Sequence, residues 1–259
     1  MAINLKTVRE IGLMKEAGKV VAEVLLKLKE VSTPGVTTAE LDDIAVEMSR
    51  KAGAATLFKG VRSPYAKRAF PGAICASINE QIVHGIPSDK VKLKDGDIIS
   101  IDFGVKLNGY CGDSAITTAV GNISEEKQKL MDITKGSLDI AIENAGPGVK
   151  WSYIARLMQS YVEAEGFSVV TDYVGHGIGR EMHEDPKVPN FVSNELLRKD
   201  FELTEGMVLA VEPMVNIGTA DTRTLQDGWT VVTADKKPSA HFEHSIAIVE
   251  NGCEVLTLK

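Results

Sequence analysis

The sequence of 259 residues predicts an α+β fold, in which one sheet has helices packed on its outer face. Two observations support this class. Segments with helical spacing of apolar residues and segments rich in β-formers are clearly separate, and they are bounded by Gly, Pro or Asn. In addition, parts of the chain recur at a nearly constant distance, which indicates a duplicated plan.

The recurrence involves one strand-like and one helix-like pair. LKDGDIISID begins at Leu93 and LTEGMVLAVE begins at Leu203, whereas PGVTTAELDDIAVEMSRKAGA begins at Pro34 and PGVKWSYIARLMQSYVEAEGF begins at Pro147. The similar offsets predict a single domain over residues 1–259. We expect it to be made of two related halves, at about 34–125 and 147–259.

The predicted helices carry start signals. Thr7-x-x-Glu10 and Thr37-x-x-Glu40 are capping boxes that open helices over about 7–30 and 37–52. Ser124 with two following glutamates opens a third over about 124–144, because acids are favourable in a first turn. A fourth helix is expected after Pro147 and Gly148, ending near Glu165.

The predicted strands are short segments rich in β-branched residues. They lie at 73–78, 97–104, 110–120, 207–217, 229–233, 242–249 and 253–258. Along such strands alternate side chains share a face, so Ile99 and Ile101 should point away from Asp102. The stretch 54–72 has no clear period, and we expect it to form a loop near the site.

Composition excludes several classes of protein. A net charge of −7 argues against a nucleic-acid-binding surface over the whole molecule. The apolar run VVAEVLLKL is interrupted by two charges and is far shorter than the ~20 residues that span a bilayer. We therefore expect a cytoplasmic protein without membrane association. Cys75, Cys111 and Cys253 lack CxxC spacing, which predicts free thiols.

Four acids lie in matched contexts. Asp102 and Glu212 end the two copies of the strand-like segment, and Asp113 and Glu243 lie in comparable later strands. Any one of them alone is more simply a strand-end or turn residue. Together, four converging carboxylates would raise one another's pKa, and two divalent cations would cancel that charge. Such a set suits Mn²⁺, Fe²⁺ or Co²⁺ at least as well as Zn²⁺ and indicates a hydrolase.

Histidines are scarce and lie in short distinctive contexts. His84 and His176 both lie in an HGI tripeptide after a β-rich stretch, and we favour a site role for both. Glycine on each side of His176 permits a close approach of backbone. His244 is adjacent to Glu243 and is interpreted as a packing residue.

The segments SIDFG, YCGDSA, GHGIGREMHEDP, VEPM, DGWTVVT and HFEHS, in this order, resemble the type I methionine aminopeptidases over nearly the whole chain. This resemblance implies the pita-bread fold, a curved antiparallel sheet with pseudo-two-fold symmetry. It implies removal of the N-terminal methionine from nascent proteins whose second residue is small, by hydrolysis with a water or hydroxide bridging two metal ions. Nascent polypeptide N-termini are then the partners. Docking at the ribosome, the oligomeric state and the physiological metal (Co, Mn, Fe(II) or Zn) stay open.

The resemblance also implies roles for individual residues. The five metal ligands would be Asp102, Asp113, His176, Glu212 and Glu243. By the same resemblance Glu212 is the general base, His84 contacts the substrate near the scissile amide, and His183 hydrogen-bonds the scissile carbonyl. The methionine pocket would be lined by Phe70, Cys75, Met182 and Trp229. Met182 stands where the family usually has Phe, and His241 where it often has Gln.

Two other functions compete with this one. An Xaa-Pro aminopeptidase or dipeptidase of the same fold usually carries an additional N-terminal domain, whereas about 30 residues precede the first repeat here. A relative that has lost its metal ligands could act as a binding module for proteins or RNA. Preference for Xaa-Pro peptides would select the first alternative, and tight binding without turnover the second.

Overall fold

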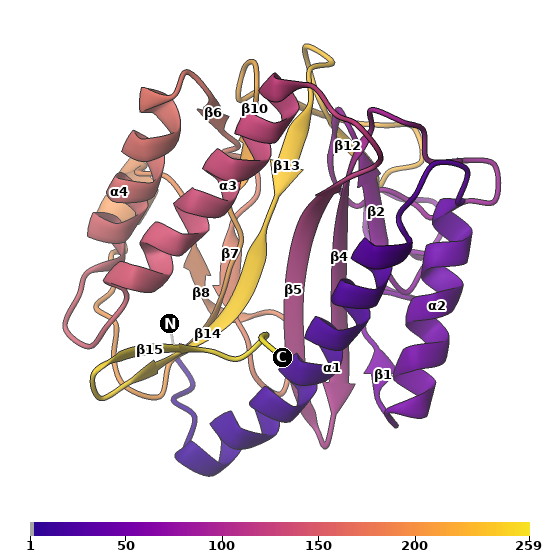
Figure 1. The fold of residues 1–259 in the computed structure, drawn as a ribbon. Coiled ribbons are helices and arrows are strands. Elements are labelled where there is room, and N and C mark those ends of the chain that lie inside the picture. Colours follow the sequence, from indigo (N-terminus) through magenta and orange to yellow (C-terminus); the bar gives the residue numbers. More distant parts are fainter. Residues whose placement is uncertain (1–2) are drawn as a thin grey trace.

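The computed structural model describes residues 3–259, and Figure 1 shows a sheet with helices α1 to α4 on one side. The helices are α1 (Val8–Val31), α2 (Thr38–Lys51), α3 (Glu125–Asn144), α4 (Trp151–Ala164) and the short α5 (Asn194–Arg198). The strands are β1 (Ala55–Thr56), β2 (Cys75–Ile78), β3 (Gln81–Val83), β4 (Ile98–Leu107), β5 (Tyr110–Ala119), β6 (Ser168–Val169), β7 (Gly175–Gly177), β8 (Glu184–Val188), β9 (Val208–Val211), β10 (Met214–Asn216), β11 (Thr222–Thr224), β12 (Val231–Thr233), β13 (Ser239–His241), β14 (Glu243–Val249) and β15 (Gly252–Val255). The predicted α+β class is confirmed.

The main sheet has nine strands in the order β1-β4-β5-β14-β9-β7-β8, with β2 beside β4 and β15 beside β14. Two three-stranded sheets, β13-β10-β6 and β11-β12-β3, complete the architecture. All of these pairings are antiparallel. The pairing of β5 with β14 joins the N-terminal and C-terminal parts of the chain in the middle of the sheet. These two central strands carry Asp113 and Glu243.

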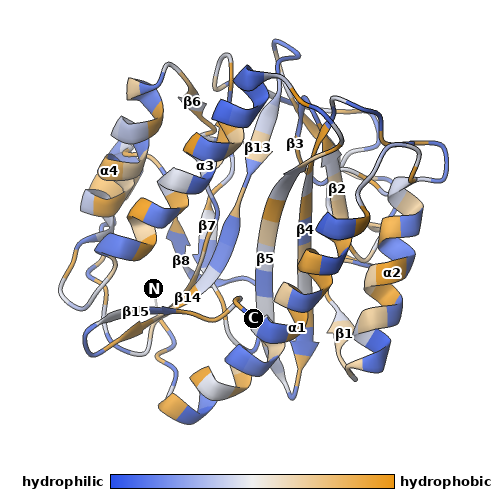
Figure 2. Ribbon diagram, viewed as in Figure 1, coloured by the Kyte–Doolittle hydropathy of each residue, from blue (hydrophilic) through white to orange (hydrophobic). Residues whose placement is uncertain are grey.

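The helices begin where their caps predict. The Thr7 side chain accepts the N–H of Glu10, and the Glu10 carboxylate accepts the N–H of Thr7; Thr37 and Glu40 repeat this arrangement. Ser124 accepts the N–H of Lys127 at the start of α3. Each cap satisfies donors that the first turn leaves free. Hydrophobic and hydrophilic residues are interleaved along α1 to α4, as Figure 2 shows, so that each helix can present an apolar stripe to the sheet.

Each pair of helices covers its own part of the sheet. Residues of α1 and α2 pack with β2, β4 and β5 in one buried cluster, and residues of α3 and α4 pack with β9 and β14 in another. Ile99 and Ile101 are completely buried in the first cluster, and Leu209 and Val211 in the second. The predicted alternation is therefore confirmed. Polar side chains at the intervening positions are left for the opposite face of the sheet.

The segments 207–217 and 54–72 can be compared with their predicted structure. The segment 207–217 is not one continuous strand, because β9 ends at Val211 and β10 begins at Met214. Pro213 lies in the break and has no N–H to offer to a ladder, which explains the interruption. The stretch 54–72 is largely irregular, as predicted, and its short strand β1 pairs with β4. The three cysteines are free. Within residues 3–259, no helix is long and apolar enough to cross a bilayer.

Candidate metal centre and substrate pocket

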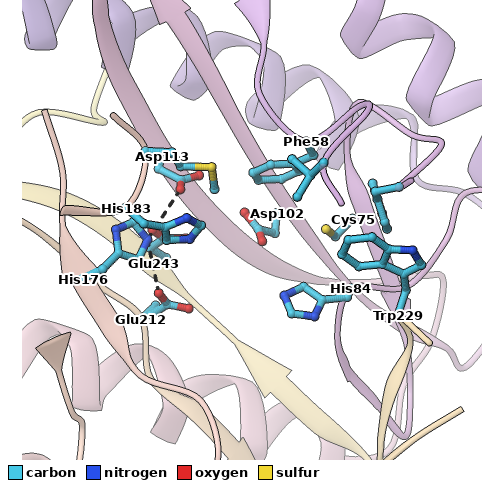
Figure 3. Close-up of a pocket in the computed structure, with 13 residues that line it drawn as sticks. Phe58, Cys75, His84, Asp102, Asp113, His176, His183, Glu212, Trp229 and Glu243 are labelled. Atoms are coloured by element: carbon cyan, nitrogen blue, oxygen red, sulfur yellow. Dashed lines mark ion pairs between the residues drawn. The ribbon is translucent and has the colours of Figure 1, made fainter. Parts of the chain in front are cut away.

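One pocket collects every residue that the sequence assigned to the site, and Figure 3 shows most of them facing a common space. Its polar side is formed by Asp102, Asp113, His176, His183, Glu212 and Glu243, and its opposite side by apolar residues around His84 and Trp229. The site thus has a charged end and an apolar end.

Strand register explains why three of the acids meet. Ala115 on β5 is paired with Asp102 of β4 on one side and with Glu243 of β14 on the other. Asp113 lies two residues before Ala115 and therefore on the same face. Gly104 is paired with Asp113, and a Cβ at this glycine would lie 2.9 Å from Asp113 Oδ1. The bare glycine leaves the room that the carboxylate occupies.

The glycines beside His176 are required by the neighbouring backbone. A Cβ on Gly175 would lie 2.3 Å from the carbonyl oxygen of Ala210, and one on Gly177 would lie 2.2 Å from that of Asp185. Both contacts are closer than real Cβ atoms come to backbone. The close approach predicted for this GHG segment is confirmed, and it seats His176 on β7 beside β9.

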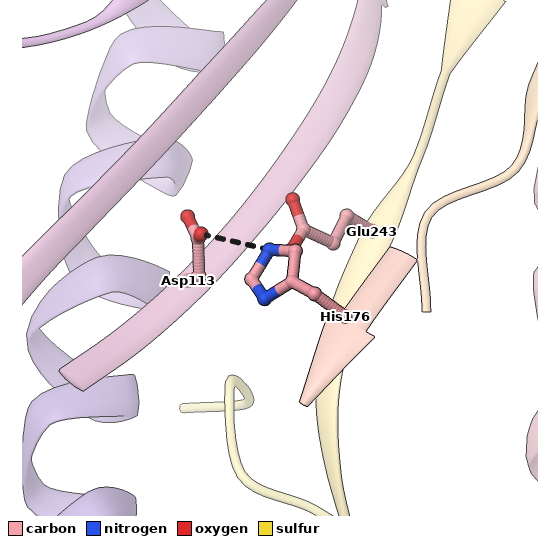
Figure 4. A group of neighbouring side chains, drawn as sticks. All are labelled: Asp113, His176 and Glu243. Atoms are coloured by element: carbon pink, nitrogen blue, oxygen red, sulfur yellow. Dashed lines mark ion pairs between the residues drawn. The ribbon is translucent and has the colours of Figure 1, made fainter. Parts of the chain in front are cut away.

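The His176 ring has a defined orientation. Its Nδ1 lies 2.9 Å from the carbonyl oxygen of Gly177, and since a carbonyl accepts only, Nδ1 carries the proton. In the neutral ring Nε2 then presents its lone pair to the acids, 3.9 Å from Asp113 Oδ2 and 3.7 Å from Glu212 Oε1. Figure 4 shows the ring between Asp113 and Glu243. A backbone bond to the far nitrogen is typical of a metal-binding histidine.

The carboxylates lie in surroundings that disfavour their charge. Burial, followed by repulsion from neighbouring acids, raises the pKa of Asp102 and of Glu243 well above the usual range. Burial also raises the pKa of Asp113 to about 7, although His176 partly offsets the effect. Within residues 3–259, Asp102 Oδ1, Asp113 Oδ1 and Glu243 Oε1 are buried without a hydrogen-bond partner. Such orphaned oxygens need a proton or a cation.

The donor atoms fit a metal ion. Asp113, His176 and Glu243 offer ligand atoms that all lie within 4.8 Å of one another, and so do Glu212, His241 and Glu243. Carboxylate oxygens with one or two imidazole nitrogens are the ligands that first-row divalent ions accept. Asp102 belongs to neither of these groups in the part of the chain that the structure describes, although its carboxylate faces the same pocket.

The other two histidines flank this cluster. The ring of His183 lies 4.3 Å from that of His176, centroid to centroid, at the more exposed edge of the pocket. His84 adopts a left-handed backbone conformation, with φ of 59°, which is uncommon for a residue other than glycine. Its ring meets Tyr173 and Trp229 edge-on. Burial lowers the pKa of His84 to about 4 and also lowers the pKa of His183. Both imidazoles are therefore neutral at pH 7.

The apolar end is a small cluster of its own. Phe58, Phe70 and Cys75 are buried there, with Met182 and Trp229 packed against them. The rings of Phe70 and Trp229 meet edge-on at 5.3 Å, and the Trp229 indole N–H donates to the carbonyl of Arg68 at 2.9 Å. The wall is thus a preformed apolar surface that ends at the charged cluster.

The sequence matches a known family over most of its length. A model described as metallopeptidase family M24 matches residues 12–250. The chain belongs to metallopeptidase family M24. A metallopeptidase needs ligands for a metal ion, and the acids and His176 of the pocket are side chains of that kind.

Relatives that match over the full chain indicate which members of M24 this chain resembles. The chain is 52% identical over 255 residues to methionine aminopeptidase 1 of Bacillus subtilis. This alignment covers 98% of this chain and 99% of the relative. The crystal structure of a methionine aminopeptidase from Thermotoga maritima superimposes with a TM-score of 0.93 at 40% identity, covering all of both chains. The expected pita-bread fold is confirmed, and within M24 the chain resembles methionine aminopeptidases from end to end.

Peptidases that act on Xaa-Pro bonds share the fold of this chain, but the match covers a smaller part of their length. A prolidase from Pyrococcus horikoshii matches 98% of this chain with a TM-score of 0.76 at 22% identity, but the match covers 63% of the prolidase. At this identity the likeness shows the fold alone.

Three residues near the site had no predicted role. Phe58 and Val61 line the pocket, and they come from the stretch 54–72, whose lack of period gave no signal for individual residues. His241 lies beside Glu212, with its Nε2 3.6 Å from Glu212 Oε2. Its place in HFEHS, two residues before Glu243, was the available signal.

Proposed function

We propose that the chain is a metal-dependent aminopeptidase that removes the N-terminal methionine from nascent proteins whose second residue is small. The observation that carries this proposal is the joining of an acid-rich, imidazole-containing cluster to an apolar wall within one pocket. The first part suits hydrolysis of an amide bond, and the second suits an unbranched apolar side chain such as methionine. The names of the full-length relatives support the same activity.

Two divalent ions are proposed as cofactors, with Co, Mn, Fe(II) and Zn as the candidates. Their ligands are proposed to be Asp102, Asp113, His176, Glu212 and Glu243, all of which line the pocket. When bound, such ions make water a better nucleophile and polarise a carbonyl group.

The chain's own groups have distinct tasks in this mechanism. The Glu212 side chain is 15% exposed and borders both the cluster and the open part of the pocket, where it accepts the proton of the attacking water. Neutral His183 donates a hydrogen bond to the scissile carbonyl oxygen as charge develops on it. His84, fixed by its backbone and by Trp229, contacts the substrate near the scissile amide. Phe70, Cys75, Met182 and Trp229 enclose the methionine side chain.

A direct assay tests this function and separates it from the Xaa-Pro alternative. Purified protein, loaded anaerobically with each candidate metal, is incubated with Met-Ala-Ser, Met-Leu-Ser and Ala-Pro-Ser, and released amino acids are quantified. We expect methionine from Met-Ala-Ser, little from Met-Leu-Ser, and loss of activity with a chelator or in Glu212→Gln. Cleavage that favours Ala-Pro-Ser, or a rate unaffected by metal removal, would refute the proposal.

Other expectations from the sequence stay predictions. They are the cytoplasmic location, contact with nascent polypeptide N-termini, docking at the ribosome, and the relation between the halves 34–125 and 147–259. Sedimentation of the protein with ribosomes, before and after a salt wash, checks the docking.

A further inference from the structure

His241 is a buried histidine whose ring nitrogen has no partner. The residue ends β13 and is 1% exposed, and within residues 3–259 its Nε2 is buried without a hydrogen bond. Oε2 of Glu212 lies 3.6 Å from this nitrogen. A buried polar atom without a partner is rare and calls for a functional explanation.

The backbone holds His241 firmly in this place. Its N–H donates to Thr117 Oγ1 at 2.9 Å, and that hydroxyl donates to the carbonyl of His241 at 2.8 Å. Ser100 Oγ lies 2.8 Å from the same hydroxyl, and His241 is also paired with Met214 across β10 and β13. The backbone of His241 is therefore fixed by these contacts, and its ring is 1% exposed.

The two oxygens of Glu212 face different imidazoles. Oε1 lies 3.7 Å from His176 Nε2, which is the nitrogen that faces Asp113, whereas Oε2 lies 3.6 Å from His241 Nε2. An ion held together with His176 would take Oε1, and Oε2 would keep the remaining negative charge. Ligating carboxylates are commonly hydrogen-bonded through this outer oxygen, which fixes their orientation.

We propose that His241 is a positioning residue that donates its Nε2–H to Oε2 of Glu212 and so holds this carboxylate in the orientation that binds metal. The inference rests on the proposed function, because it requires an ion in the site. It assigns the Nε2-protonated tautomer to His241, whereas His176 carries its proton on Nδ1. The two imidazoles on either side of Glu212 thus differ in role, one as ligand and one as donor.

Direct ligation is the competing role for His241. Its Nε2 lies within 4.8 Å of ligand atoms of Glu212 and Glu243, so a cation between the three residues would also satisfy it. That arrangement needs a lone pair on Nε2, and a hydrogen bond needs a proton there. Glutamine separates the two roles, because its side-chain amide donates a hydrogen bond but is a poor ligand for a transition metal.

The test measures Co²⁺ binding to four metal-free proteins: wild type, His241→Ala, His241→Gln and the control His244→Gln. Calorimetry gives the affinity, and the visible absorption of Co²⁺ reports its ligands. His244 follows Glu243, but its Nδ1 bonds Thr257 Oγ1 at 2.8 Å, away from the pocket. We expect His241→Ala to lower Co²⁺ affinity about 10–100-fold, as loss of an outer hydrogen bond to a ligand does. His241→Gln should recover most of that affinity with an unchanged spectrum, and His244→Gln should bind as wild type does.

Three outcomes would overturn the positioning role. They are wild-type affinity in His241→Ala, binding by His241→Gln as weak as that of His241→Ala, and a changed Co²⁺ spectrum in His241→Gln, which would indicate lost ligation. Circular dichroism checks that each variant is folded. Wild-type protein that binds Co²⁺ but cleaves no Met-Ala-Ser would refute the proposed function and leave this comparison valid. Unchanged Co²⁺ affinity in His241→Ala with normal cleavage would refute the inference alone.

Discussion

Lys6 and Glu184 form an ion pair that is almost completely buried, with Nζ 2.8 Å from Oε2 and the side chains 6% and 10% exposed. The other oxygen of Glu184 accepts the N–H of Glu181. The pair therefore fixes the N-terminal segment against the turn that presents Met182 and His183 to the pocket. Burial raises the pKa of Glu184, but the bonds from Lys6 and Glu181 outweigh it and the net shift is downward.

Removal of one member of this pair should be costly. We expect Lys6→Met to lower the free energy of unfolding by about 3 kcal/mol, because a buried charge without its partner keeps its desolvation cost. Lys6→Met combined with Glu184→Gln should recover much of that loss. Urea unfolding measures both. Lys135→Met is the control, since the Lys135–Asp139 pair is exposed and such pairs contribute about 0.5 kcal/mol. Equal losses in Lys6→Met and Lys135→Met would contradict the structural role.

The glycines of β7 give a second prediction. Gly177→Ala would place a Cβ 2.2 Å from the carbonyl oxygen of Asp185, so β7 must shift and move His176. We expect a loss of about 1–3 kcal/mol in stability, as for other overpacked sites, and weaker Co²⁺ binding. Gly12→Ala is the matched control, because it lies in α1 with nothing within 4 Å of its new Cβ. That control should be more stable by about 0.5–1 kcal/mol.

If Gly177→Ala keeps wild-type Co²⁺ affinity and stability, the close approach of β7 to its neighbours is not what places His176. Differential scanning calorimetry gives the stability difference, and titration of the metal-free protein gives the affinity. The two readouts together separate a moved ligand from a general loss of packing.

The dependence of stability on pH follows from the raised carboxyl pKa values. In metal-free protein Asp113 has a pKa of about 7, whereas an unfolded chain releases this proton near pH 4. The folded state binds more protons between these values, so the contribution of Asp113 is full below about pH 4 and is lost as pH rises through about 7. The free energy of unfolding of wild type minus that of Asp113→Asn should therefore fall from pH 5 to pH 8.

Metal should reverse this trend. Mn²⁺ competes with the protons on the acids, so the stabilisation that it gives should grow over the same pH range. Thermal unfolding with chelator and with Mn²⁺, at pH 6 and pH 8, measures this stabilisation by the metal.

For the metal-free protein, the contrary result would be a stability difference between wild type and Asp113→Asn that rises with pH. That result would contradict the burial of the Asp113 carboxyl group.

The apolar wall can be tested at Trp229. Trp229→Ala removes the edge-on contacts with Phe70 and His84. We expect kcat/KM for Met-Ala-Ser to fall roughly 10–100-fold, with most of the change in KM, since loss of apolar pocket contacts costs about 1–3 kcal/mol. Tyr65→Ala is the control on the neighbouring loop, because Tyr65 is 86% exposed and lies outside the pocket lining. An unchanged KM in Trp229→Ala would exclude this residue from the substrate pocket.

Much of the fold could be predicted because its signals are local. The capping boxes at Thr7 and Thr37 located two helices almost to the residue, and alternation placed Ile99 and Ile101 in the core. The break at Pro213 was not predicted, although proline gave the signal. The three-residue strand around His176 was also not predicted as a strand, because so short a segment with two glycines has no periodicity.

The candidate site depended on information of a different kind. Recurrence and the family resemblance selected eleven residues, and all of them line one pocket. The register that puts Asp102 and Glu243 on either side of Ala115 is a long-range property, which no local pattern encodes. For the same reason Phe58 and the proximity of His241 to Glu212 could be seen only in the folded chain. The roles of these residues stay predictions.

In the proposed function, the acids and imidazole of this pocket hold two divalent ions. Anomalous diffraction from crystals of the protein grown with Mn²⁺ tests it most directly, because it locates the metal independently of activity. We expect two anomalous peaks, about 3.5–4 Å apart, enclosed by Asp102, Asp113, His176, Glu212 and Glu243. Fully occupied Mn²⁺ elsewhere in the protein with no peak among these five side chains would contradict it.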